Sequence, residues 1–403
     1  MSITKQNIRN FASSKDCTGC MACIDSCNYN AITYGLSTKG YIKIYVNNKA
    51  CVGCAKCISV CPQLSCHQYS TENKLANGYA VWNNDVEQRK TSASGGAFSA
   101  IATYILKNGG IVYGAALDGF EVKHIRIDNV VDLVLLQNAK YQHSITKGIY
   151  KSVRRDLILG NIVLFSGLGC QVAALYSFLG KISTENLYTI DTICGGVSTI
   201  LPMLELKHSG KYHGILSFRD KEKHGWSSKG FSYRLKMVGK YGNEVDLGNN
   251  NLVLNSFSSK ILKRSSCLNC QFVGLQRNSG CTVGDFWGDK CFKSQHSNGL
   301  SAIIIHDSKM ENLLKKCNLS LKPVDVESIA SGNPNLFYGN FKGIRYLLSR
   351  HLSFIFLKCR INKWAYALSD WNSIFSLEMR MYMRFIHKYI KKAFMLQIKQ
   401  IRK

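Results

Sequence analysis

From about Thr91 onward, apolar positions follow two alternating patterns along the chain. Short apolar runs, typical of buried strands, alternate with stretches whose apolar positions lie three and four residues apart, typical of helices. The pattern predicts helices at residues 97–107, 153–159, 171–179 and 199–208, and strands at 111–116, 161–165 and 187–193. Strands that alternate with helices indicate an α/β domain with a largely parallel sheet.

The residues before this domain have a different pattern. Cysteine-rich loops flank residues 41–46 (YIKIYV), whose alternation of polar and apolar positions predicts a strand. The polar residues 70–80 are interpreted as a linker. We therefore expect a head at 1–69, the α/β domain at 80–330 with two parts at about 80–165 and 166–330, and a helical basic tail at 331–403.

Eight cysteines of the head form two matching runs with C-x2-C-x2-C-x3-C spacing, and the second run begins 34 residues after the first. Three cysteines at this spacing can bind one 4Fe–4S cluster, whereas the fourth cysteine of each run binds the other cluster. The runs predict a bacterial-ferredoxin-type α+β head with two clusters. One is expected on Cys17, Cys20, Cys23 and Cys61, and the second on Cys51, Cys54, Cys57 and Cys27.

Two zinc sites are the alternative for the head, because C-x2-C pairs also suit tetrahedral zinc. Four thiolates at this spacing, present twice, are typical of iron–sulfur proteins and unusual for zinc, so iron–sulfur clusters are preferred. Cys66 lies outside both runs and receives no role.

Composition and charge narrow the class of protein. The 403 residues are 46% apolar and 19% charged, which is typical of a folded chain. Nine of the 17 cysteines lie between Cys17 and Cys66, too close together for a disulfide framework, so a reducing compartment is expected. The formal net charge of +27 favours an acidic electron donor, an anionic substrate or an anionic membrane surface.

Four later cysteines suit a third site. Cys170 begins a helix after the strand at 161–165, where the helix dipole stabilises a thiolate, and Cys194 follows the next strand. Both lie at the sheet edge where open α/β folds bind ligands. With Cys267 and Cys270 they make the four ligands of one 4Fe–4S cluster. Spacing alone leaves open that Cys170 and Cys194 are buried apolar residues instead.

Two loops with glycines precede helices. Residues 92–96 (SASGG) could bind a phosphate through backbone N–H groups, or could form a tight turn with an N-cap. Gly167 and Gly169 match a dinucleotide-binding motif only weakly, because Val172 stands where glycine or alanine is needed. The residues alone therefore leave a nucleotide site open.

Several motifs in the same order resemble those of one family. They are SASGGAFSAI, NAKYQHS, FSGLGCQVAAL, NLYTIDTICGGVS, FRDKEKHGWSS and CLNCQFVGLQRNSGCTVGDFWGD. From about Cys17 to about Leu313 the chain resembles the beta subunit of coenzyme F420 hydrogenases and dehydrogenases, in the bacterial form with a fused ferredoxin head. The resemblance implies a flavin-binding α/β domain in which FAD lies beside a further 4Fe–4S cluster. Relatives of this form often accompany polysaccharide-synthesis genes.

The resemblance also implies positions for these cofactors. Its cluster ligands correspond to the same four cysteines, Cys170, Cys194, Cys267 and Cys270. Its flavin positions correspond to Ser94, Gly95, Gly96, Lys140, Tyr141 and Ser144. Lysine and serine suit a pyrophosphate, and Tyr141 could pack on a ring.

The chain departs from the family's motifs at two places without losing a ligand. Leu168 and Gly169 replace a Thr-Pro pair, and Gly195 replaces a histidine, so the family's substrate specificity is not carried over. Asp285 matches a family motif but receives no chemical role. Cys281 is not a family ligand position, and Cys291, Cys317 and Cys359 are interpreted as structural or incidental.

Residues 341–403 carry 14 Lys or Arg against two acidic residues. Residues 379–401 predict an amphipathic helix with one basic face, typical of contact with an anionic bilayer or of packing on the domain with a solvated face. No apolar run precedes Cys17, and the chain contains no apolar stretch of 18 residues that is free of charged residues. We expect a cytoplasmic protein. The alternative is a protein that the basic tail attaches peripherally to the inner membrane surface.

The residues and the resemblance together predict an iron–sulfur, flavin-dependent oxidoreductase. Electrons would pass from ferredoxin or another acidic donor through 4Fe–4S clusters to FAD, and then to a small-molecule or lipid-linked substrate. One alternative is a non-catalytic electron-transfer subunit of a larger redox complex. Another is a nucleic-acid-binding protein, which the charge suggests but no recognition motif supports. Catalytic residues, the substrate and use of the deazaflavin coenzyme stay open.

Overall fold

The computed structural model describes residues 8–12, 15–64, 77–226, 233–258, 262–287 and 289–336. The chain divides into two compact units, Met1–Ile355 and Phe356–Lys403, and only the first contains described residues. The predicted tail helix, Cys66 and Cys359 lie outside the described residues. Among the helices described, none has the length and apolar character needed to cross a membrane.

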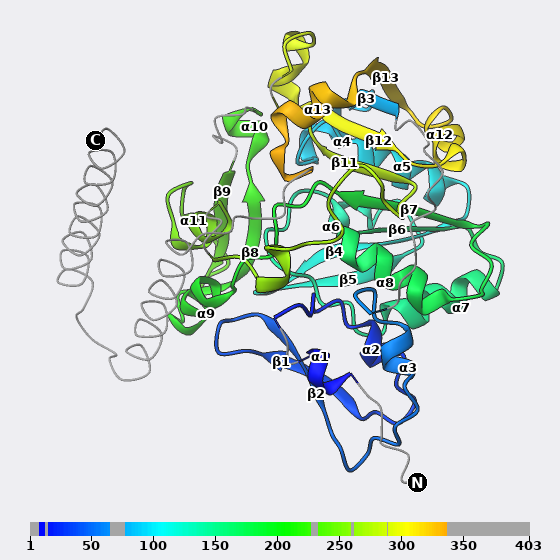
Figure 1. Ribbon diagram of the computed structural model, residues 1–403. Coiled ribbons are helices and arrows are strands. Elements are labelled where there is room, and N and C mark those ends of the chain that lie inside the picture. The colour runs from blue at the N-terminus through cyan, green and yellow to red at the C-terminus, as the bar shows by residue number, and fades with distance from the viewer. Residues whose placement is uncertain are drawn as a thin grey trace, which may run out of the picture. The chain divides into compact units, whose positions relative to one another are not determined.

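The head is built around a two-stranded antiparallel sheet (Figure 1). The predicted strand at 41–46 is found as β2 (Ile42–Val46), which pairs with β1 (Ile32–Leu36). Ile32, Ile42 and Ile44 are buried and pack together as the head's own small core. The head's short helices are α1 (Arg9–Ala12), α2 (Ala22–Asp25) and α3 (Lys56–Ser59).

An eight-stranded mixed sheet forms the centre of the second domain. Its strands are β3 (Asn77–Asn83), β4 (Ile111–Asp118), β5 (Glu121–Ile127), β6 (Val163–Gly167), β7 (Leu187–Thr192), β11 (Cys281–Asp285), β12 (Ser301–Ile305) and β13 (Leu319–Val324). Their order is β13-β3-β12-β11-β7-β6-β4-β5 (Figure 1). The central strands β4, β6, β7 and β11 are parallel, as the alternation with helices predicted. The outer strands on both sides are antiparallel, which makes the sheet mixed.

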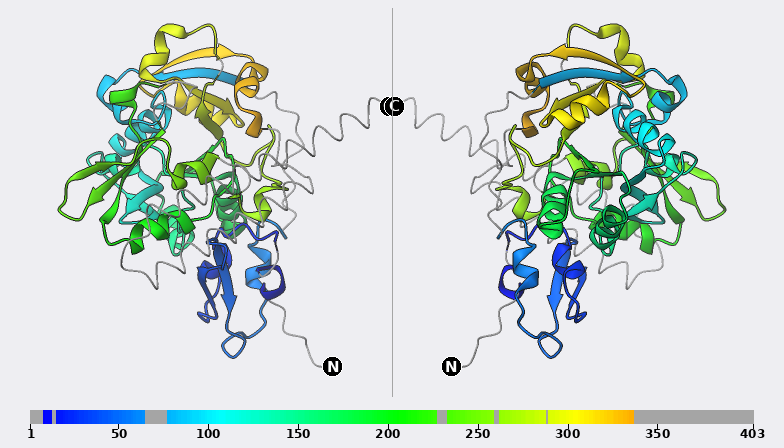
Figure 2. Two further views of the ribbon diagram at one scale, coloured as in Figure 1. Left: turned by 90° about the vertical axis from the view of Figure 1, so that its left-hand side faces the viewer. Right: turned by 90° about the vertical axis from the view of Figure 1, so that its right-hand side faces the viewer.

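Part of the predicted linker is a strand of this sheet. Residues 77–80 belong to β3, which pairs with β12 on one side and with β13 on the other (Figure 2). Its central residue Ala80 is fully buried. The linker interpretation was wrong for these residues, because their partners are more than 200 positions away and leave no local signal. Residues 70–76 lie outside the described residues.

Helices cover both faces of the large sheet. α5 (Ala97–Lys107) and α12 (Ser308–Leu314) pack on one face, and α7 (Ile149–Ile158) and α8 (Gly169–Leu179) pack on the other. Successive residues of β6 serve the two faces: Leu164 joins the first core, whereas Val163 and Phe165 join the second. The other short elements of this domain are α4 (Val86–Thr91), α6 (Leu133–Leu136), α13 (Val326–Gly332), η2 (Ser265–Cys267), η3 (Lys293–Asn298) and η4 (Pro334–Leu336), and α9 (Leu201–His208), whose Met203 packs in the core of the small sheet described next.

A second, three-stranded antiparallel sheet was not predicted. It contains β8 (Tyr212–Arg219), β9 (Tyr233–Gly239) and β10 (Glu244–Asp246), and it is accompanied by α10 (Lys221–His224) and α11 (Leu252–Ser258). Its core includes Phe218, Leu235 and Met237, which are fully buried. Tyr141 packs against this core, so the small sheet borders one of the expected flavin positions.

The head is fastened to the second domain by hydrogen bonds from buried polar groups. The Asp25 carboxylate accepts from the backbone N–H groups of Gly148 at 2.6 Å and Tyr150 at 3.1 Å, where α7 begins. A head carboxylate therefore satisfies free N–H groups at a helix start of the other domain. Arg264 donates to the carbonyl oxygens of Cys17 at 2.6 Å and Ile42 at 2.7 Å.

Candidate functional site

The two cysteine loops of the head share one backbone conformation. Gly19 and Met21 in the first loop have φ of 76° and 64°, and their counterparts 34 residues later, Gly53 and Ala55, have φ of 75° and 60°. Left-handed φ is uncommon for methionine and alanine, so both loops adopt the same costly turn. A short helix follows at once in each loop. The sequence repeat is thus also a structural repeat.

Four head cysteines gather on the side of the second domain; we call Cys17, Cys20, Cys23 and Cys61 the inner group. Burial raises the pKa of Cys20 to about 12, and the nearby Cys61 and Cys17 thiols add to the increase. Burial also raises the pKa of Cys23, with further contributions from Cys20, Cys17 and Cys61. These mutual charge effects indicate that the four thiols lie near one another, and Cys57 also acts on Cys23.

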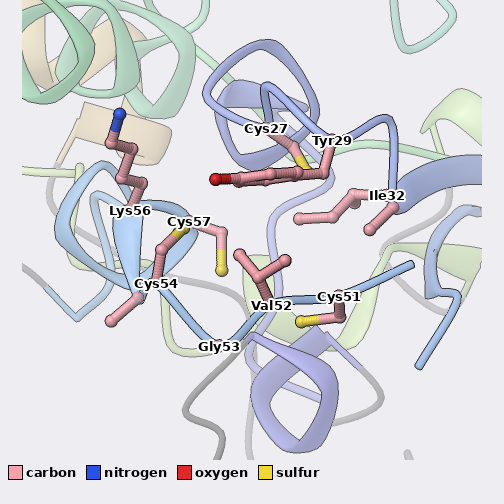
Figure 3. A pocket seen from close by; sticks show the side chains of 11 residues that line it. Cys27, Tyr29, Ile32, Cys51, Val52, Gly53, Cys54, Lys56 and Cys57 are labelled. Carbon is pink, nitrogen blue, oxygen red and sulfur yellow. The ribbon is translucent and has the colours of Figure 1, made fainter. Parts of the chain in front are cut away.

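The other four head cysteines line one cavity, which Figure 3 shows from close by. We call Cys27, Cys51, Cys54 and Cys57 the outer group. Tyr29, Val52 and Lys56 line the same cavity. Cys27 therefore leaves the three cysteines of its own run and joins those of the second run. Cys54 is exposed, whereas its counterpart in the inner group, Cys20, is 8% exposed.

The structure also brings together the third predicted set, Cys170, Cys194, Cys267 and Cys270, which we call the third group. Cys170 lies in the first turn of α8, and Cys194 follows β7, at the carboxyl edge of the parallel strands. Cys267 ends η2. The pKa of Cys170 is raised well above its ordinary value by burial first, and then by Cys270, Cys20, Cys194 and Cys267. Segments from three parts of the chain thus place four thiols in one site.

The surroundings of the third group suit a bound 4Fe–4S cluster. Backbone N–H groups of Gly196, Val197 and Phe272 donate to the sulfur atoms of Cys194 at 3.3 Å, Cys267 at 3.4 Å and Cys270 at 3.4 Å, respectively. Hydrogen bonds to sulfur are typical of cluster ligands. The charge of Arg277 lowers the pKa of Cys194 and Cys270, against the larger effect of burial. Such a cation offsets the charge of roughly −2 that a four-thiolate cluster carries.

Within the described residues, no set of three or more His, Cys, Asp or Glu side chains already stands at metal-coordinating geometry. The fold brings the thiols of each group near one another. Four sulfur donors per group are the ligand set that a 4Fe–4S cluster requires.

The third group lies next to the inner group of the head. The charge of Cys20 acts on the thiol of Cys170, and both cysteines act on the buried Tyr150 between the two domains. The Tyr150 hydroxyl donates to the Cys20 carbonyl oxygen at 2.8 Å, and Thr146 Oγ1 donates to the same oxygen at 2.7 Å. The ligand loop of the inner group is therefore held against the domain that carries the third group.

Five of the six expected flavin residues lie in two segments that are connected through Arg219 and Lys221. Ser94 Oγ donates to the Leu300 carbonyl oxygen at 2.8 Å, and Gly95 N donates to Ser301 Oγ at 2.9 Å, so the SASGG turn lies on β12. Gly96, with φ of 84°, is the N-cap of α5. Lys221 donates to the Ser94 carbonyl oxygen at 2.6 Å, and Asn138 donates to the Arg219 carbonyl oxygen at 3.2 Å. The start of α10 therefore connects the turn to the segment that contains Lys140 and Tyr141.

The sixth residue, Ser144, lies closer to the third group. Its Oγ accepts from Gln171 Nε2 at 3.0 Å, and Gln171 follows Cys170 in α8. Tyr141 is stacked on Phe257 with ring centroids 4.0 Å apart, so the aromatic face expected for a flavin ring is in contact with this phenylalanine.

Two poorly exposed lysines accompany these segments: Lys221 is buried, and Lys140 is half-buried. Burial lowers the pKa of Lys140 to about 7. Burial first, and then Arg89 and Arg219, lower the pKa of Lys221 to about 7. Within the described residues, Lys140 and Lys221 donate only to backbone carbonyl oxygens. Buried cations without a carboxylate partner are costly and suit an anionic ligand such as a pyrophosphate. Sequence analysis missed Arg89 and Lys221, although the FRDKEKHGWSS motif contains the latter.

Asp285, which received no role from the sequence, has a structural one. It forms an ion pair with Arg219 at 3.1 Å and accepts from Trp226 Nε1 at 2.8 Å. Arg219 in turn lies over the Tyr233 ring, 4.8 Å from its centroid. Asp285 therefore fixes an arginine and a tryptophan between the two sheets.

The other cysteines that the structure describes belong to none of the three groups. Cys281 is fully buried within β11 and belongs to the apolar core under α5. The Cys317 thiol donates to the Leu313 carbonyl oxygen at 3.3 Å, and Cys291 is exposed.

Comparisons with known proteins identify two segments. The family model of the 4Fe-4S dicluster domain matches residues 16–64, and the model for the C terminus of the coenzyme F420 hydrogenase/dehydrogenase beta subunit matches residues 160–327. Within residues 160–327 the chain is therefore similar to this beta-subunit family. The resemblance is thereby confirmed, and the beta-subunit segment contains the whole third group. The residues expected around the flavin all lie outside both matched segments.

Among solved structures, the F420-reducing [NiFe] hydrogenase complex from Methanosarcina barkeri, determined after xenon derivatisation, contains a similar chain. It is 15% identical, with a TM-score of 0.42, over 70% of this chain and 90% of that chain. No curated protein matches the sequence.

Proposed function

We propose that this protein is an iron–sulfur flavoprotein oxidoreductase that passes electrons from a ferredoxin-like donor to FAD and then to a substrate. The observation that carries the proposal is the packing of Cys20 of the head in the same buried cluster as Val172, which follows Cys170 by two residues in α8. Electrons can leave a head with two clusters only if another redox site lies close to it.

The burial of the cysteines supports an order along this route. The outer group is the most accessible, since it contains the exposed Cys54. The inner group is covered, and it adjoins the third group. A donor protein would thus deliver single electrons at the outer group, and they would reach the third group through the inner one.

The residues around the SASGG turn would hold the flavin. Backbone N–H groups at the start of α5, together with Lys140 and Lys221, would bind the pyrophosphate. FAD, when bound, would collect two electrons and transfer them as a pair to the substrate. Ser144 and Gln171 link this region to Cys170 and would keep the flavin near the third cluster. Phe257 would have to move from the Tyr141 ring if a flavin stacks there.

Anaerobic purification with iron, sulfide and flavin counted per chain tests the proposal. Three clusters and the flavin predict about twelve irons and one FAD. About eight irons without flavin would contradict it and would leave a non-catalytic electron-transfer subunit.

A serine substitution separates the third group from the head. Cys194→Ser should remove about four irons and leave about eight. Cys291→Ser changes an exposed cysteine outside the three groups and should leave the iron content unchanged. Equal iron in the two variants would show that the third group binds no cluster.

Methionine substitutions test the anion site. Lys140→Met and Lys221→Met should each weaken FAD binding by about tenfold or more, because each removes a buried cation from the pyrophosphate. Lys223→Met, on the exposed side of α10, is the matched control. Fluorescence titration of flavin-free protein with FAD measures the affinities. Unchanged affinity in both buried variants would place the flavin elsewhere.

A further inference from the structure

His143 is a buried polar residue for which the proposed electron route gives no role. It is 7% exposed. Neither Nδ1 nor Nε2 has a hydrogen-bond partner among the described residues. A neutral imidazole always carries one N–H donor, and burying a donor without an acceptor costs free energy.

Two other histidines with little exposure, the buried His124 and the half-buried His306, each have at least one ring nitrogen in a hydrogen bond. His124 Nε2 lies 2.9 Å from the Ser166 carbonyl oxygen, and His306 Nε2 lies 2.8 Å from Thr282 Oγ1. Burial first, then the charge of Arg264 and His124, lower the pKa of His143 to about 3, so its ring is neutral at pH 7. His143 therefore holds a donor whose acceptor must be a group other than the described side chains and backbone.

The position of the ring indicates which acceptor this is. A Cβ atom added to Gly19 would come within 3.1 Å of His143 Cε1, the atom between the two ring nitrogens. Gly19 lies between Cys17 and Cys20, so the ring packs on the loop that carries two ligands of the inner group. Arg264 holds the same loop through the Cys17 carbonyl oxygen. No side chain at position 19 separates the imidazole from this loop.

The residue next to His143 points toward the third group, because Ser144 accepts from Gln171 beside Cys170. His143 thus lies between the loop of the inner group, through Gly19, and the start of α8, through the neighbouring Ser144.

We propose that His143 donates its ring N–H to a sulfur atom of the inner cluster and thereby raises the reduction potential of that cluster. When the cluster accepts one electron, its charge becomes more negative, and a hydrogen bond to sulfur stabilises this added charge. His143 acts through the cluster and is a positioning residue. The inference rests on the head clusters of the proposed function and is independent of the flavin.

EPR-monitored redox titration of the anaerobically purified full chain tests this role. His143→Phe keeps a ring of similar size but removes the donor, and it should lower the midpoint potential of one cluster while the others keep theirs. His143→Gln, which retains an N–H donor, should restore much of the loss. His213→Phe is the control: it removes an exposed imidazole that is hydrogen-bonded to the Lys240 carbonyl oxygen in the small sheet, and it should leave all potentials unchanged.

Pulsed EPR on protein labelled with ¹⁵N-histidine gives a direct readout. The reduced inner cluster should show a coupling to one imidazole nitrogen, and this coupling should vanish in His143→Phe.

Unchanged potentials in His143→Phe with full iron content would overturn the inference, as would a shift confined to the third cluster. If the anaerobically purified unsubstituted protein contained no iron in the head, the proposed function itself would be overturned. The two failures are distinguishable, because the first occurs with full iron content.

Discussion

The two cysteine loops of the head differ in their surroundings far more than in their sequence. Both have the same spacing and the same left-handed positions. The inner loop, however, is covered by the second domain and hydrogen-bonded through the Cys20 carbonyl oxygen, whereas the outer loop leaves Cys54 exposed. A duplicated motif thus repeats its ligand geometry, while docking to another domain gives one copy a different environment. Access and reduction potential follow that environment.

The largest contrast is expected in metal removal. Incubation of the anaerobic protein with a strong iron chelator should remove about four irons from the outer group before the inner group loses any. The reason is that Cys54 is exposed, whereas Cys20 and Cys23 are buried. Iron release and the EPR spectrum, followed together, measure the order. Loss of both head clusters at one rate would remove the proposed difference in access.

A large effect on stability is expected at Tyr150, which is fully buried under the inner loop. Tyr150→Ala should lower the free energy of unfolding by about 3–5 kcal/mol, because it leaves a cavity and removes one of the two hydrogen bonds to the Cys20 carbonyl oxygen. Tyr150→Phe removes only the hydroxyl and should cost about 1 kcal/mol. Urea unfolding under anaerobic conditions measures both values. Tyr29→Ala changes a tyrosine that is 54% exposed beside the outer group and should cost less than either.

A smaller effect is expected at Asp25, the residue that links α2 to the start of α7. Asp25→Ala should cost about 1–2 kcal/mol, because the N–H groups of Gly148 and Tyr150 lose their acceptor. Hydrogen exchange at these two amides should become faster. Ser59, its counterpart in the second repeat, is exposed and its hydroxyl donates to the nearby Lys56 carbonyl oxygen, so Ser59→Ala should leave the same amides unchanged. Equal effects in the two variants would argue against Asp25 as the link.

Local signals predicted the parts of the molecule that depend on short sequence distances. Cysteine spacing predicted which thiols gather in the head, including the exchange of Cys27 and Cys61 between the two runs. Apolar periodicity predicted α5 at residues 97–107 with its observed bounds, because Gly109 and Gly110 end the helix. Cysteine spacing alone did not decide whether the third group binds a cluster. Within the fold, Cys170 and Cys194 come together because the parallel strands before them end at one edge of the sheet.

The remaining features depend on contacts between distant segments. β3 was missed because its partners β12 and β13 follow it by more than 200 residues. His143 carries no local mark, since only the packing of Gly19 on its ring reveals its position. Lys221 is exceptional because it is buried among carbonyl oxygens, and a lysine in a charged stretch is otherwise expected to be solvated.

The attachment of Asp25 has a consequence for how the protein matures. Asp25 lies between Cys23, a ligand of the inner group, and Cys27, a ligand of the outer group. With these ligand assignments, both clusters fix residues 23–27. The Asp25 carboxylate in this segment accepts hydrogen bonds from the N–H groups at the start of α7. Insertion of iron and closure of the interface between the domains then become one assembly step, and a chain short of either cluster would present a loosened junction to the cell's proteases.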